Sequence, residues 1–189
     1  MKAQPNSDSP ATAAVVTVDA TMLGLPPETA STTAIFGLVG SAGRATLRFD
    51  TDSFLAAIQA LSSLVTAVVF IGVDDHGYPN DSDQKLAPDG LAAMIASLTS
   101  HSPSRPDVVV YQTPATSAVK KVGTDGTVLT TIDRDLLNPI HPPEVVARPA
   151  LDAAIAALVS IPTSRPETIN PTEIVAQNGG IVMMDNAAV

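Results

Sequence analysis

Residues 65–72 read VTAVVFIG, an uncharged run that is rich in β-branched side chains. Such a run is typical of a strand that is buried on both faces, as the central strands of parallel sheets are. Similar apolar runs occur at residues 13–18, 35–40 and 107–112, and the segments between them have helical spacing or loop composition. This alternation predicts an α/β fold with a mainly parallel sheet.

Helices are predicted between these runs by apolar side chains that recur on one face. Their stripes are Phe54, Leu55, Ile58, Leu61 and Leu64, then Leu91, Ile95 and Leu98, then Leu151, Ile155 and Leu158. Asp50 can cap the first helix, Pro88 suits the start of the second, and Asn170-Pro171 opens a further short helical turn. A terminal strand is expected after Gly179-Gly180.

The charge balance restricts the partners. The chain has 189 residues, with 10 Lys+Arg against 19 Asp+Glu and a formal net charge of -9. This acidity leaves no basic face for a phosphodiester backbone, so we expect no nucleic-acid partner. The absence of cysteine excludes disulfides and zinc sites that need sulfur.

Residues 1–12 are polar, rich in Pro and Ser, and lack the layout of a signal peptide. We interpret them as a disordered tail before a single α/β domain over residues 13–189. The longest apolar run, around residues 67–73, is too short to cross a bilayer. The expectation is a cytoplasmic protein with no membrane partner.

A β-hairpin is predicted around Gly123-Thr124-Asp125-Gly126, because Asp-Gly between two β-prone runs is a strong hairpin signal. The surrounding residues 114–141, PATSAVKKVGTDGTVLTTIDRDLLNPIH, resemble the arm of the 2-C-methyl-D-erythritol 4-phosphate cytidylyltransferases. The positions that carry the resemblance are Pro114, Thr116, Val119, Lys120, Val122, Asp125, Gly126, Val128, Thr131, Asp133, Arg134 and Leu137.

Weaker similarity over residues 39–55, 136–158 and 173–184 extends the resemblance to about half the chain. It implies a three-layer, mainly parallel sheet of the nucleotide-diphospho-sugar-transferase type. A hairpin arm, at about residues 114–134, would protrude from it.

The resemblance also implies candidate site residues. Thr116, Lys120 and Arg134 would bind substrate or phosphate, with Arg134 reaching the partner subunit's substrate. The alternative is that the two cations are exposed arm charges that stabilise the hairpin or pair with acids such as Asp133 and Asp135. Asp74 and Asp75 follow the central strand and could hold a divalent metal, or they could simply belong to a solvated acidic loop.

Departures from the family pattern bear on activity. The family's first strand leads into a glycine-rich loop with an Arg and then a Lys, which holds the nucleotide phosphates. Residues 15–18 match that strand, and the residues 19–28 that follow contain one Gly, two acids and no cation. Residues 40–44, GSAGR, indicate a tight turn, and no Gly-Gly block with Arg and Ser for reading cytosine occurs between residues 72 and 88.

The expected function is therefore that of a catalytically degraded cytidylyltransferase-like protein that acts as a dimeric binding or scaffolding protein. The arm would pack against its equal in a second copy, another protein is a further candidate partner, and no cofactor is expected. The alternative is an active CTP-dependent nucleotidyltransferase that acts on a polyol- or sugar-phosphate of isoprenoid precursor synthesis, with Mg²⁺ at Asp74 or Asp75. A chance hairpin on an unrelated α/β domain is the third interpretation.

Overall fold

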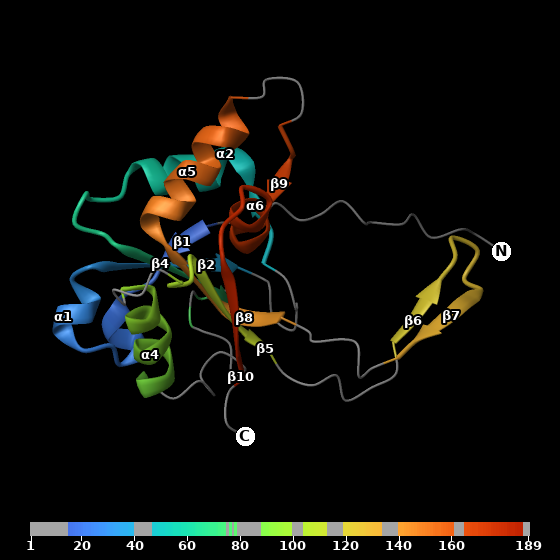
Figure 1. Cartoon of the computed structure of the whole chain (residues 1–189), viewed down its shortest axis with the longest axis horizontal. Helices are drawn as coiled ribbons and strands as arrows, with labels where there is room; N and C mark the ends of the chain where they lie inside the picture. Colours follow the sequence, from blue (N-terminus) through green and yellow to red (C-terminus); the bar gives the residue numbers. More distant parts are fainter. Residues whose placement is uncertain are drawn as a thin grey trace.

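A computed structural model of the chain describes residues 15–39, 47–74, 76, 78, 88–99, 104–112, 119–133, 140–160 and 165–186. The predicted tail at residues 1–12 lies outside them. Figure 1 shows the elements, which are, in chain order, β1 (Val15–Thr17), η1 (Ala20–Leu23), α1 (Pro27–Ala30), β2 (Thr33–Val39), β3 (Phe49–Asp50), α2 (Thr51–Gln59), β4 (Ala67–Val73), α4 (Pro88–Leu98), β5 (Val108–Gln112), β6 (Val119–Val122), β7 (Val128–Ile132), β8 (Ile140–Ala147), α5 (Arg148–Val159), β9 (Thr168–Ile169), α6 (Pro171–Gln177) and β10 (Val182–Asn186).

The central sheet has six strands in the order β1-β2-β4-β8-β5-β10. β2 pairs with β4, and β5 with β10, in parallel, whereas β8 is antiparallel to both of its neighbours and β1 is antiparallel to β2. Strands β2, β4, β5 and β10 therefore point the same way. The predicted α/β fold with a mainly parallel sheet is confirmed.

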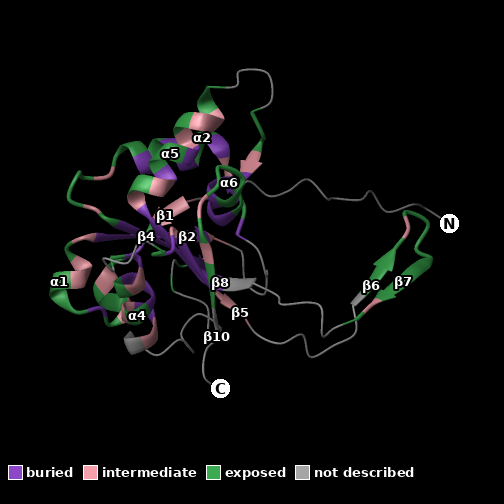
Figure 2. Ribbon diagram, in the orientation of Figure 1, coloured by how far each residue is buried: buried purple, intermediate pink, exposed green. Residues whose placement is uncertain are grey.

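Helices cover both faces of this sheet and make three layers (Figure 1). One face packs against α2, α5 and α6, and the other against α4 together with residues around η1. The purple strands of Figure 2 lie between these layers, and every residue of β4 is buried. This agrees with the uncharged sequence of β4, which offers apolar side chains to both faces.

All four phenylalanines of the chain meet in the core on the α2 side of the sheet. Phe70 of β4 is central to this cluster, because its ring centroid lies 6.1 Å from Phe36, 5.3 Å from Phe49 and 5.7 Å from Phe54. Phe70 itself has no exposed surface. These rings supply bulk that the surrounding Ala, Val and Leu side chains cannot.

The predicted helices form, with one difference at a boundary. Asp50 caps α2 by accepting a hydrogen bond from the Ser53 N–H at 2.9 Å, and Phe54, Leu55 and Ile58 are buried as expected. The helix ends at Gln59, however, so Leu64 lies beyond it and is 71% exposed. The predicted apolar stripe was too long by two residues, since Leu61 also lies beyond the helix.

β8 is a strand that the sequence interpretation did not contain, although it lies at the centre of the sheet. Its sequence, IHPPEVVA, includes two prolines and an acid, all of which are rare in central strands. The prolines fall at a register shift in the pairing with β5, where Val110 pairs with Glu144 and Tyr111 with His141. Pro142 and Pro143 thus occupy an irregularity of the ladder, the place where a missing N–H is tolerated.

The predicted hairpin is also present. β6 and β7 form their own two-stranded antiparallel sheet, and Figure 1 shows it apart from the six-stranded sheet. In its turn, the Asp125 carboxylate accepts hydrogen bonds from the Thr127 N–H at 3.0 Å and hydroxyl at 2.6 Å, and Gly126 has φ 84°. The left-handed backbone at this position explains why the turn needs glycine.

None of the helices in the part of the chain that the structure describes has the length and apolarity needed to cross a membrane.

Candidate functional site

The carboxyl ends of β2, β4, β5 and β10 share one edge of the sheet, because these strands point the same way. In open α/β sheets, ligands bind outside this edge. β2 and β4 are neighbours there, and their last register pair is Val39 with Val73. In the sequence, Val39 is followed by residues 40–46, which lie outside the described residues, and Val73 is followed by Asp74.

Asp74 has a structural task in the loop after β4. Its Oδ1 atom accepts hydrogen bonds from the backbone N–H groups of His76 and Tyr78, both at 2.9 Å, and its own N–H donates to the Tyr78 carbonyl at 2.9 Å. The side chain therefore holds a tight loop closed at the carboxyl edge. Asp75, the other predicted metal ligand, lies outside the described residues.

No group of three or more His, Cys, Asp or Glu side chains that could hold a metal ion occurs among the described residues. Of the predicted metal pair, only Asp74 can therefore be assessed, and its Oδ1 atom is engaged by the loop backbone. A metal role for Asp74 or Asp75 at this edge stays a prediction.

The structure corrects the match of residues 15–18, now β1, to the family's phosphate-binding strand. β1 is a three-residue edge strand, antiparallel to β2, so its carboxyl end lies at the opposite edge of the sheet. After β1, Asp19 caps η1 by accepting a hydrogen bond from the Thr21 N–H at 2.9 Å, and Gly24 ends η1 with a φ of 67°. The acidic residues 19–28 thus do not follow a strand of the ligand-binding edge, and their lack of cations is no evidence about a nucleotide site.

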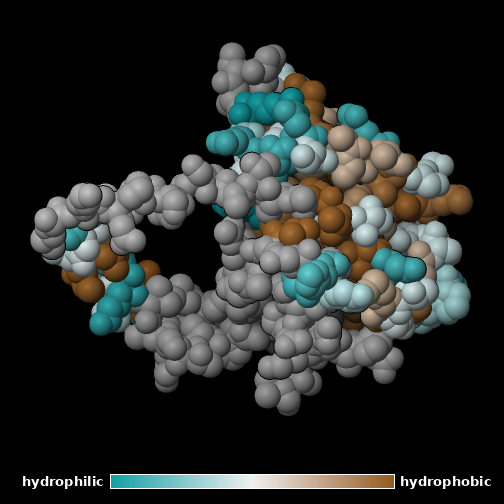
Figure 3. Space-filling model, turned by 180° about the vertical axis from the view of Figure 1, so that it is seen from behind, coloured by the Kyte–Doolittle hydropathy of each residue, from teal (hydrophilic) through white to brown (hydrophobic). Residues whose placement is uncertain are grey.

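Of the three predicted phosphate ligands in the arm, only Lys120 lies among the described residues. Lys120 is exposed on β6, opposite Thr131 of β7. Thr116 and Arg134, the other two predicted phosphate ligands, lie outside the described residues. The described part of the arm also exposes apolar side chains, namely Val122 at 53%, Val128 at 54% and Leu129 at 61%. In Figure 3 the arm accordingly shows hydrophobic atoms beside hydrophilic ones.

A buried polar cluster lies on the α6 side of the sheet, where sequence reasoning expected none. Glu144 of β8 is 1% exposed and accepts hydrogen bonds from the Thr172 hydroxyl at 2.6 Å and from Asn170 Nδ2 at 3.0 and 3.2 Å. Asn170 Nδ2 also donates to the Leu47 carbonyl at 2.9 Å. Burial raises the pKa of the Glu144 carboxyl, and the hydrogen bonds from Thr172 and Asn170 oppose that shift.

The sequence carries two signals for this cluster. Glu144 directly precedes the apolar Val145-Val146-Ala147, and Asn170 precedes Pro171 as a helix cap. The cap is confirmed, since Asn170 Oδ1 accepts a hydrogen bond from the Glu173 N–H at 2.7 Å. The partnership with Glu144 depends on pairing across 26 residues of sequence, which no local pattern shows.

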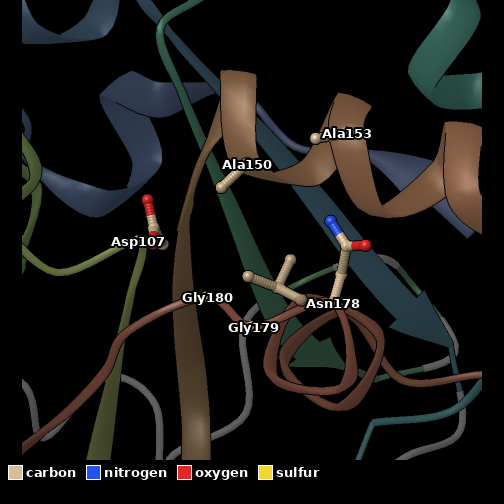
Figure 4. Close-up of a pocket in the computed structure, with 7 residues that line it drawn as sticks. Asp107, Ala150, Ala153, Asn178, Gly179 and Gly180 are labelled. Carbon is tan, nitrogen blue, oxygen red and sulfur yellow. The ribbon is translucent and has the colours of Figure 1, made fainter.

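Shallow depressions of about 200 Å³ lie between α5 and α6. One of them is lined by Asp107, Ala150, Asn178 and Gly180, among others (Figure 4). Asp107 Oδ2 accepts a hydrogen bond from the Ile181 N–H at 2.9 Å, so this carboxylate serves the loop before β10. Asp107 precedes β5, which puts the depression at the edge opposite the carboxyl ends of the parallel strands.

Solved structures share the architecture that carries this edge. A 4-diphosphocytidyl-2C-methyl-D-erythritol synthase from Anaerococcus prevotii superposes with a TM-score of 0.52 at 15% identity, over 72% of this chain and 56% of that chain. A 2-C-methyl-D-erythritol 4-phosphate cytidylyltransferase from Thermus thermophilus gives a TM-score of 0.51 at 13% identity, over 72% of this chain and 58% of that one. The chain thus spans little more than half the length of these structures.

No protein-family model and no curated protein sequence matches the chain. The structural likeness defines the class of fold, a three-layer α/β fold with a mainly parallel sheet. Within this class, the chain has a fold similar to that of the 2-C-methyl-D-erythritol 4-phosphate cytidylyltransferases. At such identities the likeness concerns the fold alone.

Proposed function

We propose that this protein binds a nucleotide by its phosphates at the carboxyl edge of β2 and β4, as a nucleotidyltransferase does. The observation that supports this proposal is the parallel pairing of β2 with β4 up to Val39 and Val73. Because of this pairing, the segments that follow the two strands begin at neighbouring points of one sheet edge. Ligands of open α/β sheets bind at such an edge.

The residues in these two segments suit a phosphate with its metal. Gly40, Gly43 and Arg44 follow β2 in the sequence. Glycines allow backbone N–H groups to approach a phosphate closely, and an arginine binds phosphate oxygens with two hydrogen bonds. Asp75 follows β4 and offers the hard oxygen ligand that Mg²⁺ prefers.

The reaction proposed for this site is transfer of a nucleotide from CTP to a polyol- or sugar-phosphate. Its support is the likeness to cytidylyltransferase structures, which concerns the fold. Thr116, Lys120 and Arg134 would then bind the acceptor phosphate, with Arg134 acting in the partner subunit's site. Mg²⁺ at Asp75 would neutralise charge on the triphosphate.

Binding of CTP with Mg²⁺ tests the nucleotide site. We expect the nucleotide to raise the melting temperature of the wild-type protein. Arg44→Ala and Asp75→Asn are each expected to weaken the affinity about tenfold or more, which is a loss of roughly 1.4 kcal/mol. Titration calorimetry with CTP, UTP, GTP and ATP gives the dissociation constants.

Asp19→Asn and Glu28→Gln are the matched controls, since each removes one carboxylate from the segment that follows β1. They are expected to leave the affinity within twofold of wild type, apart from the small general effect of net charge. No stabilisation of the wild type at millimolar nucleotide would contradict the proposal. So would an equal loss of affinity in the controls.

A second candidate function, favoured by the exposed arm, is that of a catalytically degraded protein that acts as a dimeric scaffold. Val122, Val128 and Leu129 present apolar surface on an arm that stands apart from the sheet, and such surface is typical of an interface. The described arm also has balanced charges, Lys120 and Lys121 against Asp125 and Asp133. Two copies of the arm can therefore meet without net repulsion. The absence of a cytosine-reading block from the sequence supports the loss of catalysis.

The double substitution V128D/L129D tests the arm dimer. The substitutions would place two carboxylates in the interface where apolar side chains were buried. We therefore expect the dissociation constant of the dimer to rise at least about tenfold. Sedimentation velocity over a concentration series measures this. Thr124→Asp adds a carboxylate at the exposed turn and is expected to leave the association unchanged; a wild-type protein that is monomeric at micromolar concentration would contradict the arm dimer.

A further inference from the structure

The Glu144 cluster connects three parts of the chain that are distant in sequence. Glu144 belongs to β8, Asn170 and Thr172 lie at the start of α6, and Leu47 immediately precedes Arg48 and β3. Asn170 is the link, because its Nδ2 atom donates both to Glu144 and to the Leu47 carbonyl, while its Oδ1 atom caps α6. All of these residues are buried.

The surroundings of Glu144 contain no counter-charge among the described residues. In the register of the sheet it lies opposite Phe70 of β4 and Val110 of β5, both fully buried and apolar. The groups that hydrogen-bond its side chain are the Asn170 amide, the Thr172 hydroxyl and the backbone of Thr172 and Leu47, and all of them are neutral. Arg48 and Glu173, which follow Leu47 and Thr172 in sequence, pair with each other at 3.2 Å on the surface, with side chains 53% and 47% exposed.

We propose that Glu144 is a proton-dependent lock: with its proton it fastens the start of α6 and the segment at Leu47 to the central sheet, and loss of the proton loosens both. A carboxyl group can remain buried among neutral partners as an acid, but the same site must hold an uncompensated charge once the proton leaves. Opening of the α6 start would let water reach that charge. The lock stands apart from the proposed nucleotide site and does not depend on it.

The direction of the pH effect follows from burial. The pKa of Glu144 is raised in the folded protein, so the unfolded chain gives up its proton first as the pH rises. The stabilisation is complete below the ordinary Glu pKa of about 4.3 and is lost as the pH rises through the raised pKa, by up to tenfold in the folding equilibrium per pH unit. Asp19, Asp50 and Asp125, whose pKa values are lowered by hydrogen bonds, act with the opposite sign and at lower pH.

The first test is the free energy of unfolding by urea, measured from pH 5 to pH 8 for the wild type and for Glu144→Gln. The amide keeps the shape of the side chain and an oxygen for the Thr172 hydroxyl, but it cannot ionise. We expect the folding constant of the wild type, relative to that of the variant, to fall at least tenfold across this range. A ratio that stays constant within threefold would overturn the lock.

Glu28→Gln serves as the matched control, because it removes one exposed carboxylate from α1 on the far face of the sheet. Its stability is expected to follow that of the wild type at every pH. If Glu144→Gln does not fold, Thr172→Val supplies the test, since it removes the hydroxyl that donates to Glu144 at 2.6 Å and leaves the carboxyl ionisable. Its loss of stability should continue to a higher pH than that of the wild type, and an unchanged profile would contradict the proposal.

Amide hydrogen exchange distinguishes a local lock from a general loss of stability. The reporters are the N–H groups of Glu173 and Ile174, which are hydrogen-bonded to Asn170, and the remote comparison is the Gly24 N–H, which is bonded to Thr21. In the wild type we expect the exchange of the α6 reporters to rise by more than the intrinsic tenfold per pH unit, and that of Gly24 by the intrinsic factor alone. The excess should vanish in Glu144→Gln, and equal pH slopes at both places would overturn the local opening.

Discussion

Phe70→Ala is expected to lower the free energy of unfolding by about 3–5 kcal/mol, as removal of a fully buried phenylalanine does in other cores. Phe70 has no exposed surface and touches the other three rings of the aromatic cluster. Its loss would leave a cavity between the sheet and α2. The chain has no tryptophan, and all four of its phenylalanines belong to this cluster. Urea denaturation with a constant m-value gives the difference directly.

Phe70→Leu is the graded control, with an expected loss of about 1–2 kcal/mol because most of the volume is retained. Leu64→Ala tests an exposed position, since Leu64 is 71% exposed, and should change stability by less than about 0.5 kcal/mol. A loss below about 1 kcal/mol for Phe70→Ala would show that the core around β4 is not packed as described.

Asn170→Ala is expected to cost about 3–5 kcal/mol, far more than an ordinary helix cap. The cap bond to the Glu173 N–H accounts for about 1 kcal/mol. The remainder arises because the buried Leu47 carbonyl loses its donor from Asn170, at about 1–3 kcal/mol, and because Glu144 loses one donor, at about 1 kcal/mol since it keeps the Thr172 hydroxyl. Thermal and urea unfolding at pH 6 measure the total.

Asp50→Ala is the matched cap variant, because Asp50 caps α2 by accepting from the Ser53 N–H and its carboxylate donates to no buried acceptor. It should cost only about 1 kcal/mol. Asn170→Asp separates the two tasks of Asn170: aspartate caps helices well, but it would put a second carboxyl beside Glu144 and lacks the amide donor. Equal stability of Asn170→Asp and the wild type at pH 7 would show that the amide bonds contribute little.

Local sequence patterns were sufficient for the elements whose signals are local. The uncharged run before Asp74 became β4, the Asp125-Gly126 turn became the β6–β7 hairpin, and Asn170-Pro171 opened α6. In each case the residue types that favour the structure lie within a few positions of one another. Helix length was less secure, since the spacing of Leu64 matched the α2 stripe although the helix ends at Gln59.

Features that depend on pairing between distant segments were missed. β8 contains Pro142, Pro143 and Glu144, whose local preferences argue against a central strand. Its neighbours and the irregular register with β5 accommodate the prolines, and Asn170 and Thr172 satisfy the acid. Only the tertiary structure brings these compensations together.

The position of the candidate site also depends on a feature that local sequence does not show, namely strand direction. The direction of a strand decides which of its ends faces the ligand-binding edge, and composition does not encode direction. β1 precedes β2 in the sequence and resembles it in composition, but it is antiparallel at the sheet edge. The end of β2, not the end of β1, therefore lies beside the end of β4 at the shared edge, at the pair of Val39 with Val73.

The position of β8 has one more consequence, for the arm. β5 and β8 are direct neighbours in the sheet, and Gln112 at the end of β5 pairs with Ile140 at the start of β8. Everything between these two residues begins and ends within one strand spacing, about 4.8 Å. Residues 113–139 are accordingly an insertion between two paired strands. The entropy of closing such a loop changes only slowly with its length, so we expect the domain to tolerate changes in the length or sequence of this insertion.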